Sequence, residues 1–276
     1  MPAMACFITD TPLSTLPHHH QADARCFTRW LLHGPGSERG EAGKAQVFME
    51  KFLSDLYNAV VAENRWQMYL EGVGNTILIS LVAVAIGTLI GLIVAIIKYY
   101  AAGNKKLWLL DKLCDLYITV IRGTPTLIQI LIMYTVIFAS VSNGIPIAML
   151  AFGINSGAYV AEIIRAGILS VDKGQSEAGR SLGLNGNMTM TLIILPQAVK
   201  NILPALFNEF IVLLKETSVA GYIGVQELTK SADLIKGRTF NGLPLFIAAG
   251  TYLIMVVGMT ALQKRLERRL AKGDNR

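Results

Sequence analysis

Long stretches without a charged residue constrain this chain more than any other feature of its sequence. Gly72 to Ile97 contains no charge over 26 residues, Gly123 to Ala161 none over 39, and Thr239 to Gln263 none over 25. A helix rises ~1.5 Å per residue, so the first stretch is long enough to cross a hydrocarbon core of ~30 Å, and the second is long enough to cross it twice. The chain is therefore predicted to be an all-α, multi-span membrane protein.

We expect five transmembrane helices within a membrane domain of residues 72–263. They are predicted at about residues 72–97, 117–141, 145–168, 198–224 and 242–263. Thr124 and Pro125 are interpreted as the cap and the first residue of regular helix in the second span. In the first span, Gly87 and Gly91 form a G-x-x-x-G pattern, which lets another helix approach closely. Residues 49–71 are predicted to form an amphipathic helix along the membrane surface.

Lys and Arg are unevenly divided between the two sides of these spans. Loops at residues 98–116, 165–190 and 264–276 carry thirteen, whereas loops at 49–71, 139–146 and 225–241 carry five. Cytoplasmic loops are enriched in Lys and Arg, so we expect the first group in the cytoplasm. The N-terminus is then outside, and the C-terminus, a basic tail at residues 264–276, is inside.

Composition and charge placement exclude other classes. The net charge of +6 lies in short segments between apolar runs, which argues against nucleic acid as a partner and for the lipid bilayer. The three cysteines, Cys6, Cys26 and Cys114, have no spacing that indicates a disulfide framework or a metal site.

Residues 1–48 differ from the rest of the chain. They hold all four histidines and two of the three cysteines, and they have no membrane or helical pattern. Three interpretations are open: a disordered tail, a Cys/His zinc site, or an artefact of start-site choice with natural translation beginning at Met49. We favour the last, because an amphipathic helix begins at once after Met49. The "GEAGKA" stretch lacks the hydroxyl residue and the first glycine of a phosphate loop, so no cofactor is expected for this chain.

A polar segment at about residues 170–192 separates the third and fourth spans. Asp172 is predicted to cap a short helix, with Gln175 in capping-box position. Glu177 and Arg180 form an i,i+3 pair on that helix. Gly183 is well placed to end it in a left-handed conformation.

This segment resembles the signature of permease subunits of bacterial ATP-driven import systems, which is Glu-Ala-Ala, three residues, Gly, nine residues, and Ile-x-Leu-Pro. The chain has Glu177-Ala178-Gly179, then Gly183, then Ile193-Ile194-Leu195-Pro196, with both spacings intact. Gly179 departs from the second alanine, and glycine lowers helix stability by roughly 0.5–1 kcal/mol relative to alanine.

Four further stretches resemble the polar amino acid branch of that family, the histidine, glutamine, glutamate and arginine permeases. They are "YLEGVGNTILISL", "VIRGTPTLIQI", "INSGAYVAEIIRAGI" and "FIVLLKETSVAGYIGVQEL". The resemblance covers about Trp66 to Leu262. It implies the type I ABC importer permease fold, with the helix near residue 177 as a short cytoplasmic coupling helix in the bacterial inner membrane.

The resemblance also implies partners. Two permease subunits, as a homodimer or heterodimer, pair across a central pathway, each docks its coupling helix on one of two ATP-binding subunits, and an external binding protein delivers substrate. ATP and magnesium are used by the ATPase partner, so this chain is a transport component and no enzyme. The residues that match the coupling signature or flank it are Glu177, Ala178, Gly179, Arg180, Gly183, Leu195 and Pro196.

Charged and polar residues inside spans are candidates for the pathway or its gate, because burying them in lipid is costly. They are Glu162, Arg165, Asn208, Glu209, Lys215, Glu216 and Thr217. Glu162 with Arg165 is either a structural ion pair or a gate. Glu209 and the "KETS" stretch offer either substrate contact or pairing at a subunit interface. Gln129, Asn155 and Ser156 are weaker candidates, and Arg122 is expected to anchor the cytoplasmic interface.

Two other classes are weighed against this interpretation. A stand-alone secondary transporter or channel needs inverted repeats or matching discontinuous helices, and five spans do not divide into two such halves. A membrane-embedded enzyme needs a metal or nucleophile constellation, and none is visible in the sequence. Basic, acidic and amide amino acids are all compatible as substrates.

Overall fold

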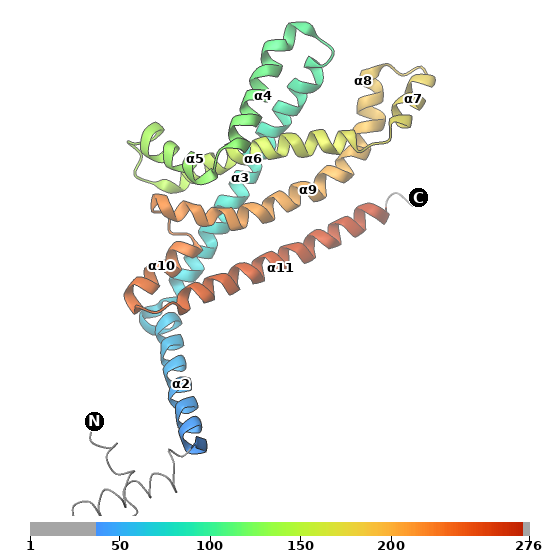
Figure 1. The fold of residues 1–276 in the computed structure, drawn as a ribbon. Helices are drawn as coiled ribbons and strands as arrows, with labels where there is room; N and C mark the ends of the chain where they lie inside the picture. The colour runs from blue at the N-terminus through green and yellow to red at the C-terminus, as the bar shows by residue number, and fades with distance from the viewer. Residues whose placement is uncertain (1–36, 273–276) are drawn as a thin grey trace, which may run out of the picture. The chain divides into compact units, whose positions relative to one another are not determined.

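The structure is a computed structural model that describes residues 37–272, with side chains described for residues 45–270. All regular structure in this part of the chain is helical (Figure 1). Four helices are long and apolar enough to cross a membrane, and the number is five when a bent helix pair is one span. The expected all-α, multi-span fold is confirmed.

The α-helices of the described residues are connected by short segments. They are α2 (Ser37–Val60), α3 (Trp66–Ala101), α4 (Trp108–Gly123), α5 (Thr126–Ile132), α6 (Gly144–Leu169), α7 (Lys173–Ser181), α8 (Gly186–Thr189), α9 (Leu195–Glu216), α10 (Leu228–Thr239) and α11 (Leu243–Lys272). Two π-helical turns, η4 (Met133–Ile137) and η5 (Met190–Ile194), follow α5 and α8, and a 3₁₀ helix, η6 (Thr217–Ile223), follows α9.

The chain divides into two units, with the boundary between Tyr57 and Asn58. The second unit holds every helix from α3 onward. The hypotheses on a zinc site and on a start at Met49 concern residues 1–48, and residues 1–36 lie outside the described part of the chain. α3 begins at Trp66, earlier than the expected start of the first span at residue 72, because the helical turn continues through "WQMYLEG".

Small residues bring α3 and α6 into close contact. A β-carbon added at Gly91 would lie 2.6 Å from Val160 Cγ1, and one added at Gly87 would lie 2.8 Å from Ser156 Cβ. α6 contributes its own glycine, since a β-carbon at Gly153 would lie 2.6 Å from an Ile86 methyl group. Such contacts let two helix backbones pack at short range. The predicted close approach at the G-x-x-x-G pattern is therefore real, and α6 is the helix that approaches.

The expected second span, residues 117–141, is broken. α4 ends at Gly123 and α5 begins at Thr126, with a bend of 107° between the two helical stretches. Thr124 is extended and does not cap α5, which corrects the sequence interpretation; its hydroxyl donates to the Val120 carbonyl at 2.8 Å. The physical reason is that Pro125 disfavours helical backbone at the residue before it, so α4 ends there.

Gln129 satisfies backbone groups that the break leaves open. Its amide nitrogen donates to the carbonyls of Ile121, at 2.8 Å, and of Thr124, at 3.1 Å. Its side-chain oxygen accepts from Asn155 Nδ2 on α6 at 2.9 Å. Non-helical backbone at membrane depth is tolerated where protein groups satisfy it. Gln129 and Asn155 therefore stabilise the break between α4 and α5.

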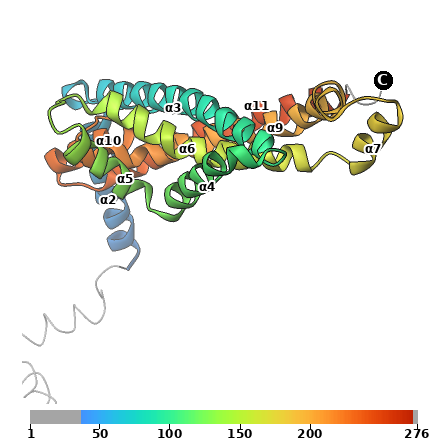
Figure 2. The same cartoon turned by 90° about the horizontal axis from the view of Figure 1, so that it is seen from above.

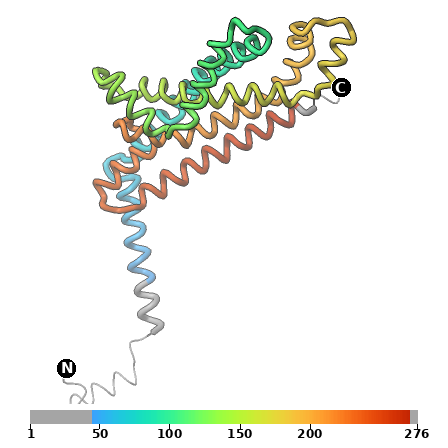
Figure 3. Tube along the Cα trace, turned by 45° about the horizontal axis from the view of Figure 1, so that its top comes forward, coloured from blue at the N-terminus to red at the C-terminus, as the bar shows by residue number. Residues whose placement is uncertain are grey.

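Contacts between helices show which connections lie at the same end of the second unit. A β-carbon at Gly72 would lie 2.9 Å from Leu228 Cα, and one at Gly144 would lie 2.9 Å from Val225 Cγ2. The starts of α3 and α6 thus share one end of the second unit with residues 225–241. Figure 2 shows α10 at that end and α7 at the other, and Figure 3 shows α11 running beside α9 toward the α7 end.

Glu227 holds α10 against α11. Its buried carboxylate accepts from the backbone N–H groups of Thr229, at 2.7 Å, and Lys230, at 2.6 Å, which caps α10. Tyr252 on α11 donates its hydroxyl to the same carboxylate at 2.9 Å. Burial raises the pKa of the Glu227 carboxyl, and the two backbone donors oppose that shift.

Candidate functional site

The coupling segment, residues 170–192, forms the short helix that the sequence predicts. Asp172 caps α7, and its Oδ1 accepts from the Gly174 N–H at 2.6 Å. Gly183 has φ of +83° and donates its N–H to the Arg180 carbonyl, while Leu184 donates to the Gly179 carbonyl. This left-handed termination satisfies carbonyls at the end of the helix, and glycine adopts it without steric cost. The predicted cap and the predicted stop are both confirmed.

Two local predictions for α7 are wrong. Gln175 does not complete a capping box; its side-chain oxygen accepts from Gln197 Nε2 on α9 at 3.3 Å. Glu177 and Arg180 are both exposed and form no ion pair with each other within the described residues. Solvent competes strongly with such surface pairs, which gain little when formed. Both side chains are therefore free to meet another surface.

The glycine at position 179 has a packing reason. Gly179 is buried against the returning helix, which α8 and η5 form together. A β-carbon there would lie 2.7 Å from Thr189 Cγ2 and 3.1 Å from Ile193 Cδ1. Alanine would force Thr189 to move. The glycine that replaces the second alanine of Glu-Ala-Ala therefore leaves room for the side chain of Thr189, which is 2% exposed.

We expect Gly179→Ala to tilt α7 away from the returning helix and to weaken its rigid attachment by roughly 1–3 kcal/mol, the usual cost of overpacking. Gly179→Ala combined with Thr189→Ala removes the clashing methyl group and should regain most of that loss. The midpoint of thermal unfolding, measured on the purified single and double variants, gives the loss and its recovery. An unchanged midpoint in the single variant would show that the contact is looser than the geometry indicates.

Hydrogen bonds tie the coupling segment to α9. Asn201 Nδ2 donates to Ser170 Oγ at 2.8 Å, and the bond from Gln197 to Gln175 lies further along the same face of α9. Together with the Gly179 contact, these bonds connect α7 to the base of a membrane-spanning helix.

The Ile-x-Leu-Pro part of the signature marks a change of helix type. η5 is a π turn, and Leu195 and Pro196 open α9 directly after it. Proline has no N–H and its ring collides with the carbonyl four residues earlier. A π turn is a common way to absorb such a break, and Gln197 Nε2 donates to the Ile193 carbonyl at 3.0 Å. Leu195 and Pro196 therefore shape the returning helix.

An exposed apolar residue directly after α7 was not singled out from the sequence. Leu182 is 79% exposed beside exposed Glu177, Ala178 and Arg180. This exposure leaves the Leu182 side chain available for contact with another protein. The signal in the sequence was a leucine directly before the closing Gly183.

Glu162 and Arg165 form the predicted ion pair on α6. Arg165 Nη2 lies 2.8 Å from Glu162 Oε2. Arg122, at the end of α4, extends the cluster: its Nη1 lies 3.9 Å from the same carboxylate oxygen, and its guanidinium carbon lies 5.3 Å from the Tyr159 ring centroid. All three charged side chains remain partly exposed. The cluster offers one acceptor and two donors next to the break between α4 and α5.

Glu209 lies deep between helices. It is 9% exposed, and its Oε1 accepts from Ser156 Oγ on α6 at 2.8 Å. Thr217 is fully buried and donates its hydroxyl to the Leu214 carbonyl. Lys215 and Asn208 are exposed instead.

The structure therefore does not bring the α9 candidates into one site. Asn208 and Lys215 are exposed, Glu209 and Thr217 are committed to contacts inside the bundle, and Glu216 is half-buried. An acceptor and a donor for an amino acid do not converge on this helix.

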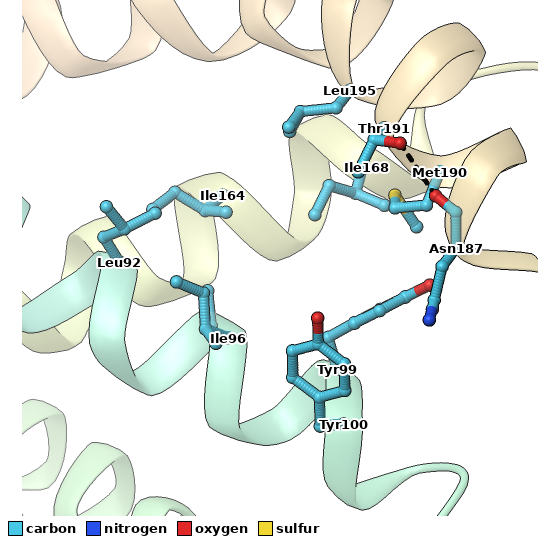
Figure 4. Close-up of a pocket in the computed structure, with 11 residues that line it drawn as sticks. Leu92, Ile96, Tyr99, Tyr100, Ile164, Ile168, Asn187, Met190, Thr191 and Leu195 are labelled. Atoms are coloured by element: carbon cyan, nitrogen blue, oxygen red, sulfur yellow. Dashed lines mark hydrogen bonds between the residues drawn. The ribbon is translucent and has the colours of Figure 1, made fainter.

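An apolar pocket of about 210 Å³ lies between α3, α6 and the returning helix (Figure 4). Leu92, Ile96 and Ile164 form much of its wall, and Tyr99 and Asn187 line it as well. None of the candidate pathway residues lines it, and no charged side chain does. It does not suit a zwitterion.

Comparisons with known proteins agree with the arrangement. The profile of a family described as "Binding-protein-dependent transport system inner membrane component" matches residues 87–272, which include α7 and its return. A putative glutamine transport system permease protein, GlnP, of Rickettsia typhi is 36% identical over 226 residues, covering 80% of this chain and 99% of the relative. The arginine transport system permease protein ArtQ of Bacillus subtilis is 37% identical over 209 residues, covering 74% of this chain and 93% of the relative.

Among solved structures, a chain from the crystal structure of an amino acid ABC transporter with histidines has a TM-score of 0.68. It is 43% identical to this chain, and the match covers 74% of this chain and 94% of that chain.

Proposed function

Because the chain belongs to the family of binding-protein-dependent transport system inner membrane components, we propose that it is the membrane-spanning permease of an ATP-driven importer of polar amino acids. The two relatives named above carry glutamine and arginine in their names, and the solved neighbour is an amino acid transporter with histidines. These three side chains are polar, which supports the substrate class.

The observation that carries the coupling role is the geometry of α7. The helix is capped by Asp172 and stopped by Gly183, it packs through Gly179 on the returning helix, and it presents Leu182 outward. We infer that Glu177, Ala178, Arg180 and Leu182 dock in a groove on an ATP-binding subunit. Movement of that subunit then reaches α9 through the bonds of Gln197 and Asn201.

The proposed assembly has three kinds of subunit. Two permease subunits pair as a homodimer or heterodimer, two ATP-binding subunits dock on their coupling helices, and an external binding protein supplies the substrate. This chain holds no cofactor in the proposal; ATP and magnesium act in the ATP-binding subunits. α7 and the basic end of α11 face the cytoplasm, and the N-terminus lies outside.

The cluster of Arg122, Glu162 and Arg165 is the proposed contact with the substrate path. An amino acid zwitterion needs an acceptor for its ammonium group and a donor for its carboxylate. Glu162 supplies the first, and either arginine supplies the second. Glu209 is assigned instead to holding α6 against α9 through Ser156.

Purification from the native host tests this function. The wild-type chain should bring down a subunit that hydrolyses ATP, and Glu177→Lys, which reverses one charge on the docking face, should lower its yield several-fold with normal membrane insertion. Lys51→Glu, an exposed charge reversal on α2, is the matched control. A chain that transports alone and brings down no ATPase would be a secondary transporter.

A further inference from the structure

α11 does not end where its apolar sequence ends. Leu243 to Gln263 is free of charge, yet the helix continues without a break to Lys272. Four basic residues come after the apolar part within the described side chains. They are Lys264, Arg265, Arg268 and Arg269, here called the basic stripe.

The basic stripe points away from the helix bundle. Gln263 Nε2 lies 3.4 Å from the Pro204 carbonyl on α9, which fixes the inward side of α11 at this level. Leu266 and Leu270, at i+3 and i+7 from Gln263, are half-buried on that side. All four residues of the basic stripe are exposed. Glu267, which is also exposed, accepts from Gln263 Nε2 at 3.1 Å.

The basic stripe continues the outward apolar face of the same helix. Phe246, Leu253 and Val257 are 76%, 63% and 59% exposed, and helical spacing carries their line onward to Lys264 and Arg268. One side of α11 is therefore apolar along the span and basic where the span ends. Acyl chains match the first part, and anionic headgroups match the second.

We propose that the basic stripe binds the phosphate headgroups of anionic phospholipids in the cytoplasmic leaflet, while the outward face of α11 packs against their acyl chains. The inference rests on the orientation proposed above. Guanidinium groups pair with phosphate through two parallel hydrogen bonds, and long basic side chains at helix ends reach the headgroup level. Arg268 and Arg269 lie furthest beyond the apolar part and make the main contacts.

Spin-labelled lipids test the proposal in the intact complex, reconstituted in vesicles of phosphatidylcholine and phosphatidylglycerol. The fraction of each labelled lipid that is immobilised on the protein gives its relative affinity. Wild-type protein should prefer phosphatidylglycerol, and Arg268→Gln with Arg269→Gln should reduce that preference by roughly 5-fold for each charge removed. Lys105→Gln with Lys106→Gln, a pair of exposed neighbours in the α3–α4 connection, should leave most of it.

Several results would overturn the proposal. An unchanged preference in the double arginine variant, or an equal loss in both variants, would show that the basic stripe is no lipid site. Loss of the ATP-binding subunit without a change in lipid preference would assign the stripe to a protein contact. A disulfide between two copies through Val257→Cys, in a background without other cysteines, would show that a second subunit covers the face. Because the lipid measurement reads neither ATP hydrolysis nor transport, its outcome is separate from that of the proposed function.

Discussion

Gly91→Leu is expected to prevent stable folding of the membrane domain. A β-carbon alone at this position would lie 2.6 Å from Val160 Cγ1 and 2.8 Å from the Ala161 backbone nitrogen, and leucine adds three more heavy atoms. The Ala161 backbone cannot yield as a flexible side chain can. We expect a loss of roughly 3 kcal/mol or more, at the upper end of overpacking effects, because α3 and α6 form the most extensive contact in the bundle.

Gly74→Leu is the matched control for this prediction. Gly74 lies on the same helix, and a β-carbon there would have no atom within 4 Å. The control should keep the wild-type amount of monodisperse protein in detergent extracts and its thermal midpoint, whereas Gly91→Leu should give aggregated protein. Equal behaviour of the two variants would contradict the close approach of α3 and α6.

Leu182→Ala is expected to weaken docking of the ATP-binding subunit and so to lower ATP-driven transport. The Leu182 side chain is 79% exposed in the isolated chain, and fully burying a leucine side chain in a groove contributes about 1.5–3 kcal/mol. Truncation should weaken docking by about 2 kcal/mol, or about 30-fold in affinity. The chain itself should remain as stable as wild type, because Leu182 touches little of it.

Ser181→Ala is the matched control, since Ser181 is the exposed neighbour and its hydroxyl only bonds back to the Glu177 carbonyl. Titration of the purified ATP-binding subunit onto reconstituted permease gives the affinity of each variant. Similar affinities for Leu182→Ala and wild type would remove Leu182 from the docking face.

The architecture was largely predictable because the length of each segment without charged residues decides whether its helix can span the bilayer. Gly183 and Asp172 were predictable for the same kind of reason, since each has one strong local conformational preference. The break at Pro125 was misread. Thr-Pro suits a helix start, but whether the preceding helix also ends there depends on groups that lie nearby in space, and the side chain of Gln129 is what makes the break acceptable.

The candidate site was less predictable where the role of a residue depends on which residues contact it in the fold. Gly179 looked like a weak point in α7, and only the position of Thr189 shows why alanine does not fit. Glu209 and Lys215 suggested a binding pair from their charges, yet one is buried against Ser156 and the other is exposed. Arg122 was expected to anchor the cytoplasmic membrane interface. Its approach to Glu162 depends on the bend after α4.

Uptake of labelled amino acids into proteoliposomes tests the central claim most directly. The purified complex would be reconstituted with its binding protein, and labelled glutamine, arginine and histidine would each be offered with and without ATP. We predict uptake of at least one of them that requires both ATP and the binding protein and falls at least tenfold in Leu182→Ala vesicles, but not in Ser181→Ala vesicles. Uptake that proceeds without ATP, or that is the same in both variants, would contradict the account of a permease driven through α7.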